Sequence, residues 1–148
     1  MEIQQANRTD AEKVFIIVTN VDATTITTGY AVNMRFGTAA SFDGAQVVMA
    51  DSDTAVDLPG FVGVAARDIA VGGAGRVQCW GYADSVYISN VGSSLTITLG
   101  DPMVPGKGAG GMFSLAPTYA SSGNKFVICG GTITISAAQY TDGFIRAI

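Results

Sequence analysis

Glycine-rich segments are the first candidates for chemistry in this sequence, because such loops can place backbone N–H groups around a phosphate. Three occur: Val71–Gly75, Gly106–Gly111 and Cys129–Gly131. A P-loop requires Lys followed by Ser or Thr at the start of a helix, whereas Lys107 is followed by Gly108. We therefore interpret the glycines as turn and bulge positions between strands, with Gly106–Gly111 in an exposed loop.

An acidic segment could bind a cation. Asp51, Asp53 and Asp57 alternate in a way that resembles part of a calcium loop. The glycine expected at the sixth place and the distal Glu are missing, and Leu58–Gly60 follows instead. A solvated acidic turn explains the pattern better, and a calcium titration read by melting temperature would separate the two interpretations.

The chain lacks the residues that usually perform nucleophilic and acid–base catalysis. The chain contains no histidine, which removes the Ser-His-Asp and Cys-His arrangements and most catalytic zinc sites. The Asp and Glu residues lie in the N-terminal segment or in and beside predicted turns. The sequence therefore indicates no pair of carboxylates that could cleave a glycosidic bond. Asp84–Ser85 and Lys107–Ser114 supply hydroxyls without a base. We expect neither an enzyme nor a bound metal or other cofactor.

Aromatic residues offer a binding surface instead. Trp80, Tyr82 and Tyr87 follow one another along a segment whose alternation places Trp80 and Arg76 opposite Val77 and Cys79. Aromatic side chains with a nearby Arg are typical of the residues that dominate protein interfaces. Packing of Trp80 beneath a covering loop fits the sequence equally well.

The charge content also favours contact with other proteins. Charged residues make up 14% of the 148-residue chain and the net charge is -4, against an average of about 25% charged residues. A surface so poor in charge suggests that part of it is covered by neighbouring chains. The 8 Lys and Arg residues form no cluster, so we expect no nucleic-acid partner.

No long apolar run indicates a membrane partner. Val14–Val18 and Phe126–Cys129 are the longest strongly apolar stretches, whereas a membrane helix needs about 18 apolar residues. The N-terminal sequence lacks the features of a secretion signal, so we expect folding in a cytoplasm. Cys79 and Cys129 are too few for a disulfide framework and are interpreted as buried free thiols, with a single bridge as the alternative.

Hydrophobic residues alternate with a period of two, and Gly or Asp turns recur about every ten residues. This pattern predicts an all-β fold, a small antiparallel barrel or sandwich. In Tyr30–Phe36 one face carries Tyr30, Val32 and Met34, and Thr residues alternate with Leu or Ile in two further segments. The ten predicted strands are Val14–Val18, Tyr30–Phe36, Ala45–Met49, Phe61–Ala65, Gly75–Tyr82, Ser85–Ser89, Ser94–Leu99, Phe126–Cys129, Thr132–Ile135 and Gly143–Ala147.

The N-terminus differs from the rest of the chain. Thr9–Glu12 could form a capping box for one or two helical turns. We divide the chain into an N-terminal arm, residues 1–13, and a single β domain, residues 14–148. The arm carries a lone Ile3 and would be either a tether that orders on a partner or a frayed terminus.

The segment Phe61–Gly81 carries a glycine-rich motif, whose residues are Gly63-Val64-Ala65, Asp68-Ile69-Ala70, Gly72-Gly73 and Gly75-Arg76-Val77. A glycine turn at Gly100–Pro102 follows, with Val104 and Pro105 after it. Together these residues resemble the bacteriophage capsid decoration proteins, also called head-stabilising or cement proteins, although Cys79 stands where the family has a second Val. The resemblance covers Leu58–Gly111.

The resemblance implies a β-barrel or β-tulip-like domain without catalytic residues. It implies a homotrimer on the outside of the mature phage head, with the major capsid protein and its own copies as partners. The protein would then be a virion component made in the host cytoplasm. The alternative is a glycan- or receptor-binding β domain of a phage appendage, with Trp80, Tyr82, Tyr87 and Tyr119 as a sugar platform. The candidate interface residues are Ile3, Phe15, Arg76, Trp80, Tyr82 and Tyr87.

Overall fold

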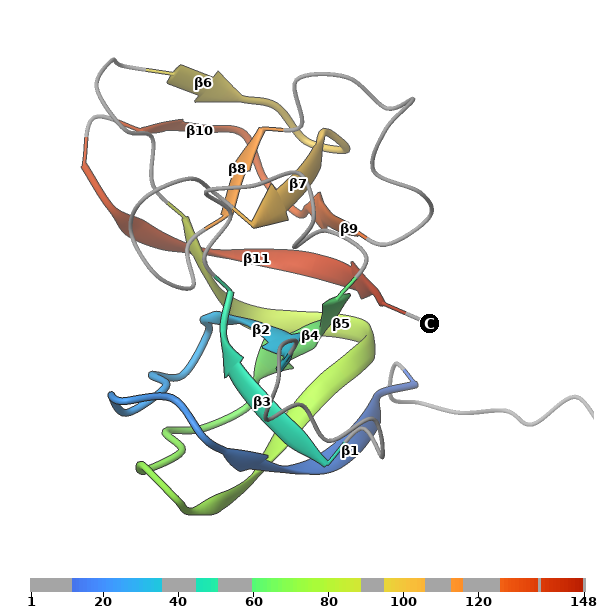
Figure 1. The fold of residues 1–148 in the computed structure, drawn as a ribbon. Helices are drawn as coiled ribbons and strands as arrows, with labels where there is room; N and C mark the ends of the chain where they lie inside the picture. Colours follow the sequence, from blue (N-terminus) through green and yellow to red (C-terminus); the bar gives the residue numbers. More distant parts are fainter. Residues whose placement is uncertain are drawn as a thin grey trace, which may run out of the picture.

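The computed structural model describes residues 12–35, 45–50, 60–88, 95–105, 113–115, 126–135 and 137–147. These residues form strands and the turns between them (Figure 1). The strands are β1 (Val14–Asn20), β2 (Ala31–Met34), β3 (Gln46–Met49), β4 (Phe61–Ala65), β5 (Ala74–Ile88), β6 (Leu95–Ile97), β7 (Pro102–Pro105), β8 (Phe113–Leu115), β9 (Phe126–Cys129), β10 (Ile133–Ile135) and β11 (Gln139–Arg146).

A closed five-stranded β-barrel occupies the lower half of Figure 1. Its strand order is β1-β3-β2-β4-β5, and β1 pairs with β5 to close the ring. This closing ladder runs antiparallel from Val14↔Trp80 to Thr19↔Ala74. Closure leaves the barrel strands without the open edges that recruit other chains, so the all-β barrel prediction is confirmed.

A second ring lies above the barrel and uses β5 again (Figure 1). Here the order is β5-β11-β9-β7-β8, and a single pairing, Ile88↔Phe113, returns from β8 to β5. The strands β6 and β10 form a separate two-stranded sheet. Two pairs, β1–β3 and β5–β8, are parallel, whereas the other ladders are antiparallel.

Strand β5 runs through both rings because it bends without ending. The segments predicted as separate strands, Gly75–Tyr82 and Ser85–Ser89, belong to one 15-residue strand that ends at Ile88. Gly81 has a φ of 98°, and a Cβ there would collide with the backbone oxygen of Glu12. Glycine therefore allows both the bend and the close passage of the chain that leads into β1.

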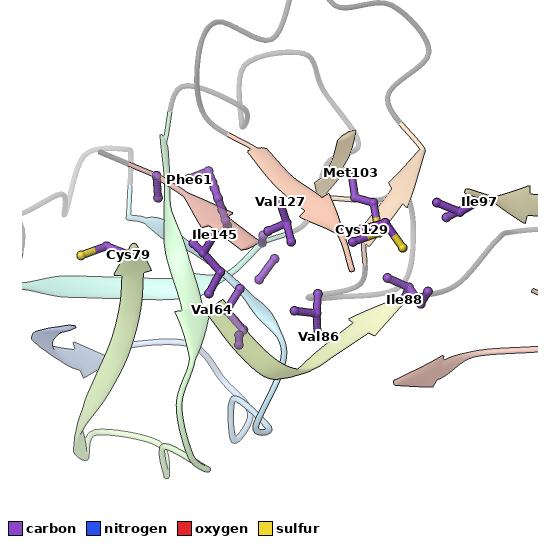
Figure 2. Packing of buried hydrophobic residues seen from close by; sticks show 14 of the residues in the cluster. Phe61, Val64, Cys79, Val86, Ile88, Ile97, Met103, Val127, Cys129 and Ile145 are labelled. Atoms are coloured by element: carbon purple, nitrogen blue, oxygen red, sulfur yellow. The ribbon is translucent and has the colours of Figure 1, made fainter. Parts of the chain in front are cut away.

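Two buried clusters fill the interior. The smaller one draws on all five barrel strands, and its members are Val18, Ile26, Val32, Val47, Val62, Ala65, Ile69 and Val77. The larger one joins the outside of β2 and β4 to the second ring; in Figure 2, Phe61, Val86, Val127 and Ile145 gather at its centre. Burying one such side chain contributes roughly 1.5–3 kcal/mol, so both clusters stabilise the fold.

The predicted alternation is confirmed in part. Val32 is buried in the barrel with Tyr30 and Met34 packed against its cluster. The opposite face of β2 is also buried, at Ala31 and Asn33, because the second ring covers this side of the barrel. A half-buried strand was therefore the wrong expectation for β2.

Strand β6 follows the alternation only as far as it extends. Ile97 is buried, while Thr96 and Thr98 are exposed as predicted. Leu99, predicted on the buried face, is 68% exposed, because β6 ends at Ile97 and the chain turns. The sequence analysis did not predict β7 or β8. The β7 segment begins and ends with Pro, which is uncommon inside strands.

Both cysteines, Cys79 and Cys129, are buried free thiols, which confirms the interpretation from sequence. In the part of the chain described here, no helix is long and apolar enough to cross a membrane. The predicted capping box at Thr9–Glu12 lies outside the described residues except for its last position.

Candidate functional site

Strand β5 carries most of the candidate interface residues. Arg76, Trp80, Tyr82 and Tyr87 all lie on it, and Phe15 lies on its neighbour β1. Ile3 is outside the described residues. The structure distributes these side chains among three contact groups along the strand rather than on one platform.

The first group joins β1 to the start of β5. The guanidinium carbon of Arg76 lies 5.4 Å from the centre of the Phe15 ring, a cation–π arrangement. Ile17 is the cross-strand partner of Arg76 and is 66% exposed, and Phe15 is also exposed. This end of the surface therefore presents apolar side chains with one positive charge.

The second group joins β5 to β11. The edge of the half-buried Trp80 ring packs against Phe144 at a centroid distance of 5.2 Å and an angle of 81°. Phe144 is also the cross-strand partner of Tyr82, and both are exposed. Trp80 is thus neither buried under a loop nor free: Phe144 from a neighbouring strand packs against it.

A hydrogen bond fixes Tyr82 within this group. Its hydroxyl donates to Oδ2 of Asp142 at 2.7 Å. This bond raises the pKa of Tyr82, because it favours the protonated phenol, and it lowers the pKa of Asp142, because it favours the carboxylate. The exposed aromatic ring is held in one orientation as a result.

The third group is a stack of tyrosines. Tyr87 stacks on Tyr30 at 4.7 Å and lies 5.0 Å from Tyr140, which comes from β11 and is half exposed. Burial, followed by the neighbouring Tyr87, raises the pKa of Tyr30. Tyr87 therefore does not join Trp80 in the predicted sugar platform, and Tyr119 lies outside the described residues.

Alternation fails between Arg76 and Trp80. Val77, Gln78 and Cys79 are all buried, although Gln78 was expected on the exposed face. The ladder with β1 is irregular here, with Val14 opposite Trp80 and Phe15 opposite Gln78. The Gln78 amide nitrogen also donates to the backbone oxygens of Trp80 and Tyr82, which compensates for its burial.

The glycine segments that the structure describes form tight turns. Gly72 has a φ of 69°, and the N–H of Gly73 donates to Ala70 at 2.9 Å. The N–H of Gly130 donates to the backbone oxygen of Asp142, and a Cβ at Gly130 would crowd the Asp142 carboxyl. The turn interpretation is confirmed for Gly72 and Gly73, Gly75 lies within β5, and Gly106–Gly111 lies outside the described residues.

The described acids hold turns. Asp68 accepts bonds from the backbone N–H and the hydroxyl of Thr28, and these lower its pKa. Asp101 receives the same pair of bonds from Thr98, again with a lowered pKa. No group of three or more Cys, Asp or Glu residues able to hold a metal occurs among the described residues. Asp51, Asp53 and Asp57 lie outside them.

Sequence reasoning missed the β11 partners of these groups, Phe144 and Tyr140, and the exposed Ile17. Alternation in the C-terminal segment places Phe144 and Arg146 opposite Ile145, which could have indicated an exposed aromatic. Their contacts with Trp80 and Tyr87 depend on long-range strand register, which this short segment does not encode.

No protein-family model matches the sequence, and a search of curated proteins finds no match.

Proposed function

We propose that this chain is a capsid decoration protein that binds the outside of a mature phage head as a homotrimer and stabilises it. The resemblance of Leu58–Gly111 to that family supports the proposal. The barrel architecture agrees with the fold that the family resemblance implies. The partners would be the major capsid protein and further copies of the chain.

The observation that carries the proposal is the exposed apolar surface beside β5. Ile17 and Phe15 on β1, and Tyr82 and Phe144 on β5 and β11, are all exposed on a chain with only 14% charged residues. Exposed hydrophobic patches mark sites of protein contact. Here the exposed side chains form two contact groups, one on β1 and one on β5 with β11. Aromatic residues and Arg dominate the energetics of such contacts.

Stabilisation needs no chemistry. A protein that binds the assembled shell and not its dissociated subunits stabilises the shell in proportion to occupancy and affinity. Each stable interface would bury on the order of 1,200–2,000 Å². A trimer that touches several capsomers multiplies weak contacts through effective concentration.

The direct test mixes the purified protein with undecorated heads. We expect co-sedimentation, higher heat tolerance of the heads, and a solution mass three times the chain mass of 15.2 kDa. Absence of both binding and heat protection would falsify the decoration proposal.

A matched pair of variants locates the contact surface. Ile17→Asp places a charge beside Arg76 on the proposed surface. Leu99→Asp is the control, because it places the same charge at the turn that follows β6, where Leu99 is 68% exposed and Ile17 is 66% exposed. We expect at least a tenfold loss of head binding for Ile17→Asp and little change for Leu99→Asp. The reverse result would overturn the placement of the contact surface beside β5.

A second candidate function is a glycan- or receptor-binding domain of a phage appendage. The stack of Tyr30, Tyr87 and Tyr140 favours it, because the half-exposed Tyr140 ring could pack against a sugar. A glycan array combined with the fluorescence of Trp80 tests this function. Specific glycan binding that is lost in Tyr140→Ala would favour it over head decoration.

A further inference from the structure

A pocket of about 220 Å³ lies between the start of β1, the end of β4 and the bend of β5. It is far larger than the roughly 15 Å³ that a single water requires. Three alanines, Ala65, Ala66 and Ala83, are among its lining residues. The pocket adjoins the proposed contact surface, because Phe15 and Arg76 belong to both.

Arg76 is one of the charged residues that line the pocket. Its guanidinium lies over the Phe15 ring, which also lines the pocket. Among the described residues, no carboxylate pairs with Arg76. A guanidinium presents N–H donors in a planar fork that matches a carboxylate. Packing on an aromatic ring holds this fork in place without using its donors.

A second cation, Lys13, also lines the pocket. Lys13 Nζ is 3.7 Å from Asp84 Oδ2, and both residues line the pocket. The Asp84 side chain is 78% exposed, so this ion pair is weak. With Arg76 included, two cations and one carboxylate line the pocket of a protein whose net charge is -4. The lining therefore favours an anion.

Gln78 gives the pocket a fixed wall. Its side chain lines the pocket and is 5% exposed. The amide nitrogen donates to the backbone oxygens of Trp80 at 3.2 Å and Tyr82 at 3.0 Å. Both amide protons are thus used, so Gln78 shapes the pocket while Arg76 supplies donors to a ligand.

We propose that this pocket binds the carboxylate of an Asp or Glu side chain from a partner protein. Arg76 donates two parallel hydrogen bonds to the carboxylate oxygens, and Lys13 adds a second positive charge. The alanine walls pack against the methylene groups of the incoming side chain. This assignment deepens the decoration proposal and rests on it for the partner, which would be the major capsid protein.

The test uses glutarate as a probe of the intact protein, followed by amide NMR shifts. We expect saturable shifts at Ala65, Ala66 and the Gln78 side-chain amide, with a dissociation constant in the millimolar range. Arg76→Gln should weaken binding at least tenfold. Arg67→Gln is the matched control, because it removes the same charge from an exposed turn residue that does not line the pocket.

Three results would overturn the proposal. The first is shifts that do not saturate, and the second is an equal loss of binding in Arg67→Gln. The third is saturation by inorganic phosphate but not by glutarate, which would make this an anion site of another kind. The amide spectrum of Arg76→Gln also shows whether the variant is folded, so misfolding is not mistaken for lost binding.

Head binding separates this proposal from the proposed function. If the wild type binds heads and Arg76→Gln binds them equally well, the pocket assignment fails and decoration stands. If glutarate saturates the pocket but the wild type does not bind heads, decoration fails and the carboxylate site stands without its partner.

Discussion

The barrel and the second ring share β5 but close in different ways. Residues from Val14 to Thr19 pair with β5 to close the barrel, whereas the pairing Ile88↔Phe113 alone returns the second ring to β5. The smaller cluster receives side chains from every barrel strand. We therefore expect resistance to unfolding to be concentrated in the barrel, where a long closing ladder and a shared core coincide.

The largest expected effect comes from filling the space between β4 and β5 in the barrel. Gly63 has a φ of 145°, and a Cβ there would collide with the backbone oxygen of Gln78. Gly63→Ala should therefore destabilise the protein by more than about 4 kcal/mol, which is exceptional for one residue. Denaturant unfolding followed by circular dichroism measures the change.

Gly72→Ala is the control for that variant. Gly72 has a φ of 69° with no atom within 4 Å of an added Cβ, so only backbone strain of about 1 kcal/mol is expected. Equal losses for the two glycine variants would show that the β4–β5 contact does not limit stability.

An intermediate effect sharpens the contrast between the two cores. Ile26 belongs to the barrel cluster and Ile97 to the larger cluster, and both are fully buried. Truncation of a buried Ile to Ala costs about 2–5 kcal/mol. We expect Ile26→Ala near the upper end and Ile97→Ala near the lower end, because the three-residue β6 can shift to fill the space.

Thermal and denaturant unfolding of both variants provide the measurement. A greater loss of unfolding free energy for Ile97→Ala than for Ile26→Ala would contradict this expectation and would place the more rigid packing in the larger cluster.

The smallest effect concerns pH and the bond between Tyr82 and Asp142. The folded pKa of Asp142 lies below its usual value of 3.8. Its contribution to stability is therefore present above that usual pKa and is lost as pH falls through the lower, folded pKa. Tyr82→Phe removes the bond, so the stability difference between wild type and variant should be constant from pH 7 to about pH 4 and shrink below it.

Unfolding free energies measured over this pH range check the expectation. Asp68 and Asp101 also have lowered pKa values and remain in both proteins, so they cancel in the difference. A difference in unfolding free energy between wild type and Tyr82→Phe that grows on acidification would contradict the stabilising role of the bond between Tyr82 and Asp142.

Local patterning predicted much of the fold because β-strand alternation is a local property. Ile97 and Val77 are buried as expected. Burial of β2 on both faces was not predictable, because it results from the second ring, which comes from distant sequence. The continuity of β5 was missed as well, since one strand was predicted to end at Tyr82 and the next to begin at Ser85, whereas β5 continues through Ala83 and Asp84.

For the candidate site, local patterning predicted which side chains reach the surface but not which side chains they contact. Phe15 and Tyr82 are exposed at the surface, and Trp80 is half-buried there. The sequence did not predict that Phe144 would pack on Trp80 or that Arg76 would lie over Phe15, because both contacts depend on which strands pair and in what register. The pocket combines β1, β4 and β5, so it too depends on ring closure.

The sharing of β5 sets an order for synthesis on the ribosome. All five barrel strands lie between Val14 and Ile88, so the barrel can close once that stretch has left the exit tunnel. Of the strands translated afterwards, β11 and β8 pair directly with β5, so the second ring cannot close without it, whereas β6 and β10 pair with each other. We therefore expect the N-terminal portion to fold first during translation and the second ring to form afterwards on β5.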